Sequence, residues 1–142
     1  MKEQIKILLV EDNEGDIILI TEALESSPTM KIETIVKNGW EAMKCLEREA
    51  PYESYLLPDL ILLDVNLPKL NGQEVLKRIK ADKQLKHIPV IMLTTSSQVK
   101  DINEAYDNYA SCFITKPEDV KDFEIVVKTI ENFWSHTAQL PG

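Results

Sequence analysis

The sequence predicts an α/β protein built on a doubly wound, five-stranded parallel sheet. Leu60-Ile61-Leu62-Leu63 is a run of large apolar residues that ends in Asp64. Such a run is typical of a strand buried on both faces, as at the centre of a parallel sheet. Strand-like and helix-like stretches alternate along the rest of the chain, and this alternation favours right-handed crossovers between parallel strands.

The elements follow one another in a regular order. The predicted strands lie at about residues 5–10, 32–36, 59–64, 90–94 and 112–115, and the predicted helices at about 13–26, 39–49, 72–81, 98–108 and 118–135, with ends set to within ~2–4 residues. The strands are apolar runs such as Ile7-Leu8-Leu9-Val10 and Val90-Ile91-Met92-Leu93. The connection over residues 49–58 exceeds the usual ~2–6 residues, and its tyrosines and leucines indicate that it packs onto the fold.

Polar residues follow four of the predicted strands. Glu11-Asp12 follows the first strand, Asp64 the third, Thr94-Thr95 the fourth and Lys116 the fifth. Open α/β sheets bind ligands at the carboxyl ends of their strands. Three carboxylates, a hydroxyl and an ammonium are therefore expected at one edge, where they could hold a divalent cation and a phosphoryl group.

Composition limits the classes of protein that this chain can form. It has 142 residues, is 44% hydrophobic and 28% charged, and carries a formal net charge of −8. Residues 1–142 are expected to form a single domain without an output domain. The acidic charge disfavours direct binding to nucleic acid or anionic lipid. With no signal peptide, no membrane span and no CxxC pair from Cys45 and Cys112, we expect a cytoplasmic protein with reduced cysteines.

Short motifs make the chain similar to the receiver domains of two-component response regulators. They are Val10-Glu11-Asp12-Asn13, Asn38-Gly39-Trp40-Glu41-Ala42, Leu63-Asp64-Val65-Asn66-Leu67-Pro68, Asn71-Gly72, Pro89-Val90-Ile91-Met92-Leu93-Thr94 and Lys116-Pro117. Each motif is weak alone, but together, in this order, they cover nearly the whole chain. The resemblance implies the flavodoxin-like receiver fold with strand order 2-1-3-4-5.

The resemblance also implies roles for the residues at the strand ends. Asp64 would be the phosphoacceptor, because a carboxylate can attack phosphorus and form an acyl phosphate. Thr94 would donate a hydrogen bond to a phosphoryl oxygen, and Lys116 would pair with its charge. Magnesium prefers oxygen ligands, and Mg²⁺ would be held by Glu11, Asp12, Asp64 and the backbone carbonyl of Asn66. Asp12 could also cap the first helix.

Three further expectations concern the fifth strand. Phe113 occupies the aromatic switch position of receivers, three residues before the lysine. The Lys116-Pro117 bond is expected to be cis, as it commonly is in receivers. Receivers often carry Gly-Ala before this strand, whereas this chain has Tyr109-Ala110, so Asn108 is expected to take the left-handed conformation.

The last helix carries an apolar arc that exceeds what core contact minimally needs. At 100° per residue the arc spans roughly 140°, compared with the ~100° stripe of a helix packed on one side; it comprises Phe133, Val126, Ile130, Phe123, Trp134, Val127 and Val120. One interpretation is a broad core stripe. The other is that Val126 and Phe133 belong to a homodimer face with the fourth helix and fifth strand, where receivers commonly dimerise.

The expected partner is a sensor histidine kinase. The chain is also similar to the single-domain regulators paired with phytochrome-type kinases. This resemblance is carried by the long loop after the second helix and by Val10-Glu11-Asp12-Asn13 with Asp16, Thr94-Thr95-Ser96-Ser97 with Asp101-Ile102, and Ile130-Glu131-Asn132-Phe133-Trp134. A haloacid-dehalogenase-type phosphatase is disfavoured, because Asn66 stands where that chemistry wants a second aspartate. A flavin or nucleotide binder is disfavoured because Glu11 and Asp12 would repel phosphate. A receiver-like module that is not phosphorylated would not need the complete acidic set and Lys116. The chain is thus expected to be a phosphoacceptor switch and not an enzyme.

Overall fold

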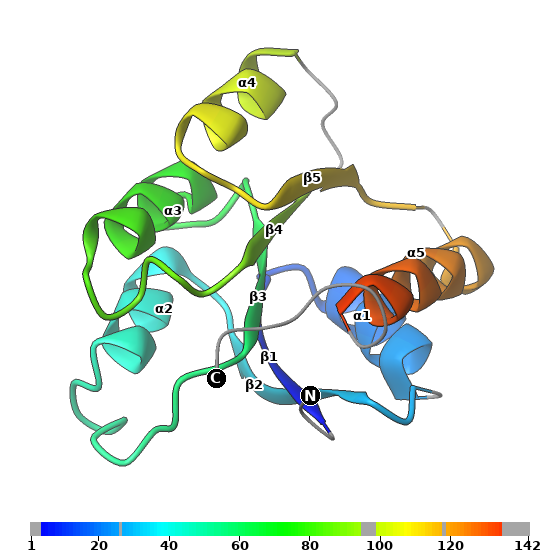
Figure 1. Ribbon diagram of the computed structural model, residues 1–142, viewed down its shortest axis with the longest axis horizontal. Coiled ribbons are helices and arrows are strands. Elements are labelled where there is room, and N and C mark those ends of the chain that lie inside the picture. The colour runs from blue at the N-terminus through cyan, green and yellow to red at the C-terminus, as the bar shows by residue number, and fades with distance from the viewer. Residues whose placement is uncertain (1–3, 26, 95–98, 118, 135–142) are drawn as a thin grey trace.

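The computed structural model describes residues 4–25, 27–94, 99–117 and 119–134 (Figure 1). Within them a parallel sheet has the order β2-β1-β3-β4-β5. Its strands are β1 (Ile5–Val10), β2 (Met30–Val36), β3 (Leu60–Asp64), β4 (Val90–Thr94) and β5 (Cys112–Thr115). The helices are α1 (Glu14–Glu25), α2 (Gly39–Leu46), α3 (Gly72–Ala81), α4 (Val99–Asp107) and α5 (Val120–Asn132). The predicted fold class and strand order are confirmed.

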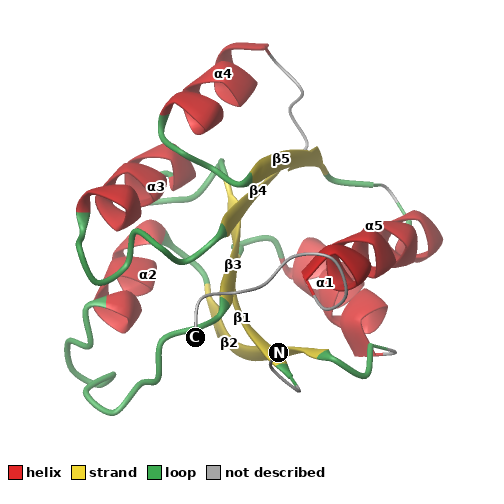
Figure 2. Cartoon of the chain, viewed as in Figure 1, coloured by secondary structure: helices red, strands yellow, loops and turns green. Residues whose placement is uncertain are grey.

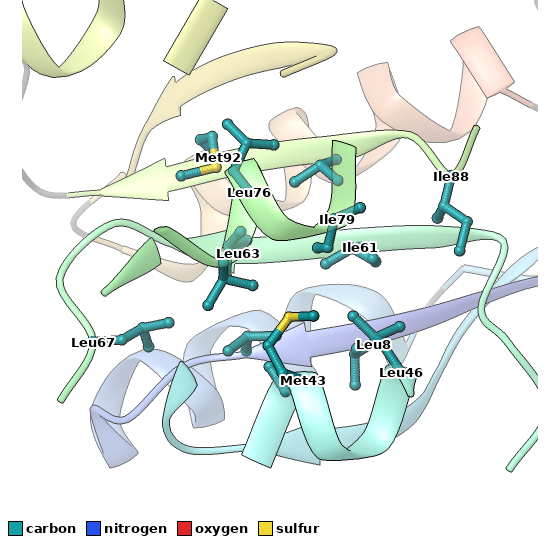
Figure 3. Packing of buried hydrophobic residues seen from close by; sticks show 14 of the residues in the cluster. Leu8, Met43, Leu46, Ile61, Leu63, Leu67, Leu76, Ile79, Ile88 and Met92 are labelled. Carbon is teal, nitrogen blue, oxygen red and sulfur yellow. The ribbon is translucent and has the colours of Figure 1, made fainter. Parts of the chain in front are cut away.

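Helices cover both faces of the sheet (Figure 2). Side chains on a strand point alternately to opposite faces, so Leu8 packs toward α2 and α3 while Ile7 and Leu9 pack toward α1 and α5. Figure 3 shows the first of these cores, which contains Leu8, Met43, Leu46, Ile61, Leu63, Leu67, Leu76, Ile79, Ile88 and Met92. All residues of β3 and β4 are buried, as expected for central strands.

Helices α2 and α4 both end in a left-handed residue that is not glycine. Arg48 has φ 58° and Tyr109 has φ 68°. After α4, Tyr109 N donates to Tyr106 O (3.0 Å) and Ala110 N donates to Ala105 O (3.0 Å), which is the hydrogen-bond pattern of a Schellman cap. The expectation for Asn108 is therefore wrong: Asn108 N still donates to Glu104 O (3.1 Å), and the chain turns one residue later.

Strand β5 lies at one edge of the sheet, beside β4. The Phe113 backbone N–H donates a hydrogen bond to the Tyr106 hydroxyl across 3.2 Å. The side chain of a residue on α4 thus occupies a position that a neighbouring strand would otherwise take.

The loop between α2 and β3 packs onto the molecule, as predicted. Tyr52 and Tyr55 lie against the core, with their rings edge to face at 6.4 Å. The Tyr52 hydroxyl donates to a Glu41 carboxylate oxygen (3.0 Å).

One prediction about peptide geometry is wrong. Among the described residues the cis peptide bond is Ala50-Pro51, and the Lys116-Pro117 bond is not cis. Because trans is favoured for any X-Pro bond by ≈ 0.5–1 kcal/mol, the residue types alone do not select the cis isomer. Within the described part of the chain, no helix has the length and apolar character needed to span a bilayer.

Candidate functional site

The carboxyl ends of β1, β3, β4 and β5 meet at one edge of the sheet, and backbone hydrogen bonds fix the residues that follow them. Glu11 N donates to Val36 O (3.0 Å), and Val65 N donates to Leu93 O (3.1 Å). Lys116 N donates to Thr94 O (2.7 Å). The ladder therefore extends past the strands and holds the site residues in register.

The Lys116 ammonium lies at the centre of this edge, with its side chain only 3% exposed. Its Nζ makes a short contact with Glu11 Oε1, and lies 2.9 Å from Asp16 Oδ2 and 3.4 Å from Asp64 Oδ2. Burial alone would lower the pKa of Lys116, but its hydrogen bonds to Glu11 and Asp16 and the charge of Asp64 raise that pKa overall. The lysine therefore stays charged among three carboxylates.

Three carboxylates could share a metal ion. Oxygen atoms of Glu11, Asp12 and Asp64 lie within 4.8 Å of one another. Glu11 is fully buried and Asp64 is 5% exposed, whereas Asp12 is exposed. Burial raises the pKa of Glu11 to about 7, even though the hydrogen bond from Lys116 lowers it. Hard oxygen donors at this spacing fit Mg²⁺ or a similar divalent cation.

Asp12 does not cap the first helix, and so remains available to the site. Asp16 N donates instead to the Asn13 side-chain oxygen (2.9 Å), and Ile17 N donates to Asn13 O (2.9 Å). Asn13 is therefore the N-cap of α1, which begins at Glu14. Its position also turns Asp16, one helical turn after Asp12, toward the strand ends.

The loop after β3 brings Asn66 beside Asp64 and Thr94. Asn66 N donates to Asp64 Oδ1 (3.2 Å), and the Asn66 side-chain amide lies 3.5 Å from Thr94 Oγ1. Thr94 itself is fully buried. Gly72 N donates to Val65 O (2.9 Å), so the start of α3 holds this loop against the sheet.

The site opens to solvent through a hollow of about 450 Å³. Its lining comprises Asp12, Asn13, Glu14, Asp16, Asp64, Asn66 and Lys116. The structure thus brings together the predicted residues Glu11, Asp12, Asp64, Asn66, Thr94 and Lys116. Asp16 joins them, although no role in the site was predicted for it from the sequence; the available signal was its spacing of four residues from Asp12.

The other predicted residues lie outside this hollow. Phe113 is half-buried on β5 and packs against the core on the α2–α3 face. Val126 on α5 is half-buried against the other core, while Phe133, the C-cap residue after α5, is 48% exposed. The roles assigned to these three residues stay predictions.

The chain matches the family model of the response regulator receiver domain over residues 7–128. It belongs to the response regulator receiver family. As a receiver domain it takes part in two-component phosphorelay signalling, which agrees with the chemistry of the strand ends. Because the match spans most of the chain, the receiver fold accounts for nearly every element described above.

Several relatives of this receiver domain cover almost its whole length. Response regulator Rcp1 from Synechocystis sp. is 43% identical over 136 residues, covering 96% of this chain and 92% of that protein. The probable methanogenesis regulatory protein FilR2 from Methanothrix harundinacea is 38% identical, covering 96% and 87%. These identities extend the family assignment beyond the site residues to the packing of the whole domain.

Solved structures show the same architecture. The phosphorylated cyanobacterial phytochrome response regulator RcpA is 48% identical and superposes with a TM-score of 0.90, covering 98% of this chain and 99% of that one. The Mn²⁺-bound form of Rcp1 is 43% identical, with a TM-score of 0.87 and coverage of 97% and 99%. The receiver domain thus shares its fold with one relative solved phosphorylated and another solved with a divalent metal.

Proposed function

We propose that Asp64 accepts a phosphoryl group from the phosphohistidine of a sensor histidine kinase, and that the modified receiver signals through altered protein contacts. The observation that carries this proposal is a buried Asp64 carboxylate, 3.4 Å from the Lys116 ammonium, at the floor of an acidic hollow. The phosphorylated structure of RcpA, at 48% identity, supports it.

In the proposed transfer, an Asp64 carboxylate oxygen attacks the phosphorus atom. The new O–P bond forms as the P–N bond to the kinase histidine breaks, and the imidazole nitrogen leaves with the electron pair. Phosphoryl transfer depends mainly on positioning and charge neutralisation. Lys116 neutralises charge on the phosphoryl oxygens, Thr94 donates a hydrogen bond to one of them, and Phe113 responds as the proposed switch residue. In this role the chain catalyses only its own phosphorylation and dephosphorylation.

We also propose that the bound metal is Mg²⁺, held by Glu11, Asp12, Asp64 and the backbone carbonyl of Asn66. The cluster of three carboxylates within 4.8 Å supports this proposal, as does the Mn²⁺-bound form of Rcp1. When bound, the cation would offset the negative charge of the carboxylates and the incoming phosphoryl group.

Phosphorylation at Asp64 can be tested with a small phosphodonor. With acetyl phosphate and Mg²⁺, one phosphoryl group should attach to the wild type and to Asp107→Asn, which changes an exposed aspartate on α4. Asp64→Asn should remain unmodified, because an amide is a poor nucleophile. Intact mass spectrometry measures the added phosphoryl group. Equal modification of wild type and Asp64→Asn would show that another residue is the acceptor.

Magnesium should raise the melting temperature of the unphosphorylated protein, because a ligand that binds only the folded state stabilises it. Asp12→Ala should lose most of this shift, since Asp12 is the exposed member of the acidic cluster. Asp107→Ala should keep it. Thermal melts at increasing Mg²⁺ measure the effect, and an unchanged wild-type melt would speak against the metal site.

We further propose that the receiver forms a homodimer through α4, β5 and α5, with Val126 and Phe133 at the interface. Exposed apolar side chains support this face, among them Val99 on α4 (70%), Ile125 on α5 (64%) and Phe133 directly after α5 (48%). Because Val126 also packs on the core, the double variant Phe133→Glu with Ile125→Glu disturbs the proposed interface with less effect on folding.

In sedimentation analysis this double variant should be a folded monomer that still accepts a phosphoryl group. A wild type that remains monomeric at high concentration would refute the dimer.

The kinase partner is proposed to be of the phytochrome type. The support is the identity to regulators named for that role: RcpA at 48% and Rcp1 at 43%. RPA3017, described as acting in red light signalling of R. palustris, is 27% identical with a TM-score of 0.87. Phosphotransfer assays against the sensor kinases of the same cell would identify the partner.

A further inference from the structure

The Lys116 ammonium has three N–H donors, and three carboxylates lie around it. Glu11 comes from the end of β1, Asp64 from the end of β3 and Asp16 from the first turn of α1. In the proposed function, Glu11 binds the metal and Asp64 becomes the acyl phosphate. Asp16 is the third neighbour of Lys116, and its carboxylate neither binds the metal nor accepts the phosphoryl group in that proposal.

We propose that Asp16 is a positioning residue that holds the Lys116 ammonium over Asp64 during phosphoryl transfer. This inference rests on the proposed function of Asp64. Asp16 Oδ2 lies 2.9 Å from Lys116 Nζ, closer than Asp64 Oδ2 at 3.4 Å. A charge-assisted hydrogen bond of this length is among the stronger contacts that a lysine makes.

The contact between Asp16 and Lys116 matters most when a cation has bound the carboxylates of Glu11 and Asp64. A cation that draws the oxygens of Glu11 and Asp64 toward itself weakens their hold on Lys116. The ammonium can then keep one donor on Asp16 and turn another to a phosphoryl oxygen, because its three donors point in different directions. Lysine has a long flexible stem, so one fixed acceptor restricts where its charge lies.

Asp16 is also suited to this role by its place in the fold. Its backbone N–H is bound by the Asn13 side chain (2.9 Å) in the first turn of α1. The Asp16 side chain is 27% exposed, whereas that of Lys116 is 3% exposed. Asp16 thus forms part of the rim of the hollow, and its substitution removes little core packing.

The test compares initial rates of phosphorylation by acetyl phosphate at fixed Mg²⁺. Asp16→Ala should react about tenfold more slowly than the wild type, because a catalytic group misplaced by about 1 Å can lose up to ~10²-fold in rate. Asp16→Asn should react within about twofold of the wild type, since the amide oxygen still accepts from Lys116 Nζ. This rescue separates a hydrogen-bonding role from a purely electrostatic one.

Glu14→Gln is the matched control. Glu14 lines the same hollow, and Glu14→Gln removes one negative charge from it, as the Asp16 variants do. Glu14 pairs with Lys37, however, and not with Lys116. It should therefore lack the tenfold loss. Thermal melts verify that each variant is folded, and Asp16→Ser, whose hydroxyl is too short to reach Lys116, replaces alanine if that variant does not fold.

The outcomes are distinct. A wild-type rate in Asp16→Ala, or equal loss in Asp16→Ala and Asp16→Asn, would overturn the role of Asp16 while modification at Asp64 persists. A wild type that is not modified at Asp64 would instead overturn the proposed function itself. A tenfold loss in alanine that asparagine restores supports the inference.

Discussion

Replacing Lys116 with methionine should destabilise the metal-free fold by about 3–5 kcal/mol, the usual loss when one partner of a buried ion pair is removed. Glu11 is fully buried and Asp64 is 5% exposed, so solvent would offset little of the carboxylate charge that the lysine leaves behind. Denaturant unfolding with and without Mg²⁺ measures the effect. Saturating Mg²⁺ should restore part of the stability, because the cation supplies the missing positive charge.

The loss should also depend on pH. Burial raises the pKa of Glu11 from 4.5 to about 7 in the folded wild type, and removing Lys116 takes away interactions that lower it. Between these pKa values the folded protein holds a proton that the unfolded chain has released, so stability falls as pH rises. The difference between wild type and Lys116→Met should therefore be smaller at pH 5 than at pH 8.

A surface lysine provides the control for this experiment. Lys77 is exposed on α3, so Lys77→Met should change stability by less than about 0.5 kcal/mol and leave its pH dependence unchanged. An equal loss at pH 5 and pH 8 in Lys116→Met would contradict the assignment of Glu11 as the group that takes up the proton.

The second large effect is expected at Gly72, where α3 begins. A Cβ added there would lie 2.0 Å from the Asp64 carbonyl oxygen and 2.8 Å from Val65 Cα. Both are backbone atoms, so the loop that carries Asp64 would have to move. Gly72→Ala should destabilise the protein by about 3 kcal/mol and slow phosphorylation of Asp64, as urea unfolding and mass spectrometry would show.

Gly15→Ala is a matched control on α1. Its Cβ would meet only the Asn13 side-chain oxygen, at 3.2 Å, and alanine is favoured over glycine in a helix by roughly 0.5–1 kcal/mol. This variant should be as stable as the wild type or slightly more so. If Gly72→Ala were as stable as the wild type, the start of α3 would not pack against the backbone of Asp64 and Val65 as closely as the structure shows.

The central sheet was predictable because its strands are uninterrupted apolar runs, and the structure buries all of β3 and β4. The start of β2 was harder to predict. This strand begins at Met30, two residues earlier than expected. The prediction started too late because the exposed Lys31 interrupts the apolar pattern near the beginning of this edge strand. The strand order came from the resemblance to receivers, which the family match now supports.

Local conformations were less predictable than the sheet. Helix α2 ends at Leu46, earlier than predicted, because Arg48 N donates to Cys45 O and Glu49 N donates to Lys44 O in a Schellman cap. With no glycine at either left-handed position, the sequence carried little signal for where α2 and α4 turn.

The contact between Asp16 and Lys116 joins residues 100 positions apart in the sequence. It depends on the direction in which α1 leaves the sheet, and Asn13 fixes that direction as the N-cap of α1. Motif spacing gives the residues that end each strand, but it does not give the rotation of the helix that follows. The residues predicted at the strand ends lie together in the structure, while the contact between Asp16 and Lys116 is visible only in three dimensions.

The hydrogen bond between the Phe113 N–H and the Tyr106 hydroxyl bears on how this protein avoids unwanted self-association. An edge strand with free N–H groups can act as a template for strands of other molecules, the first step toward aggregates. Here a side chain of the same domain occupies one of those groups at 3.2 Å. A strand of another molecule that pairs with β5 must first displace the Tyr106 hydroxyl from this N–H. Helix α4, which carries Tyr106, therefore disfavours the addition of further strands to this edge of the sheet.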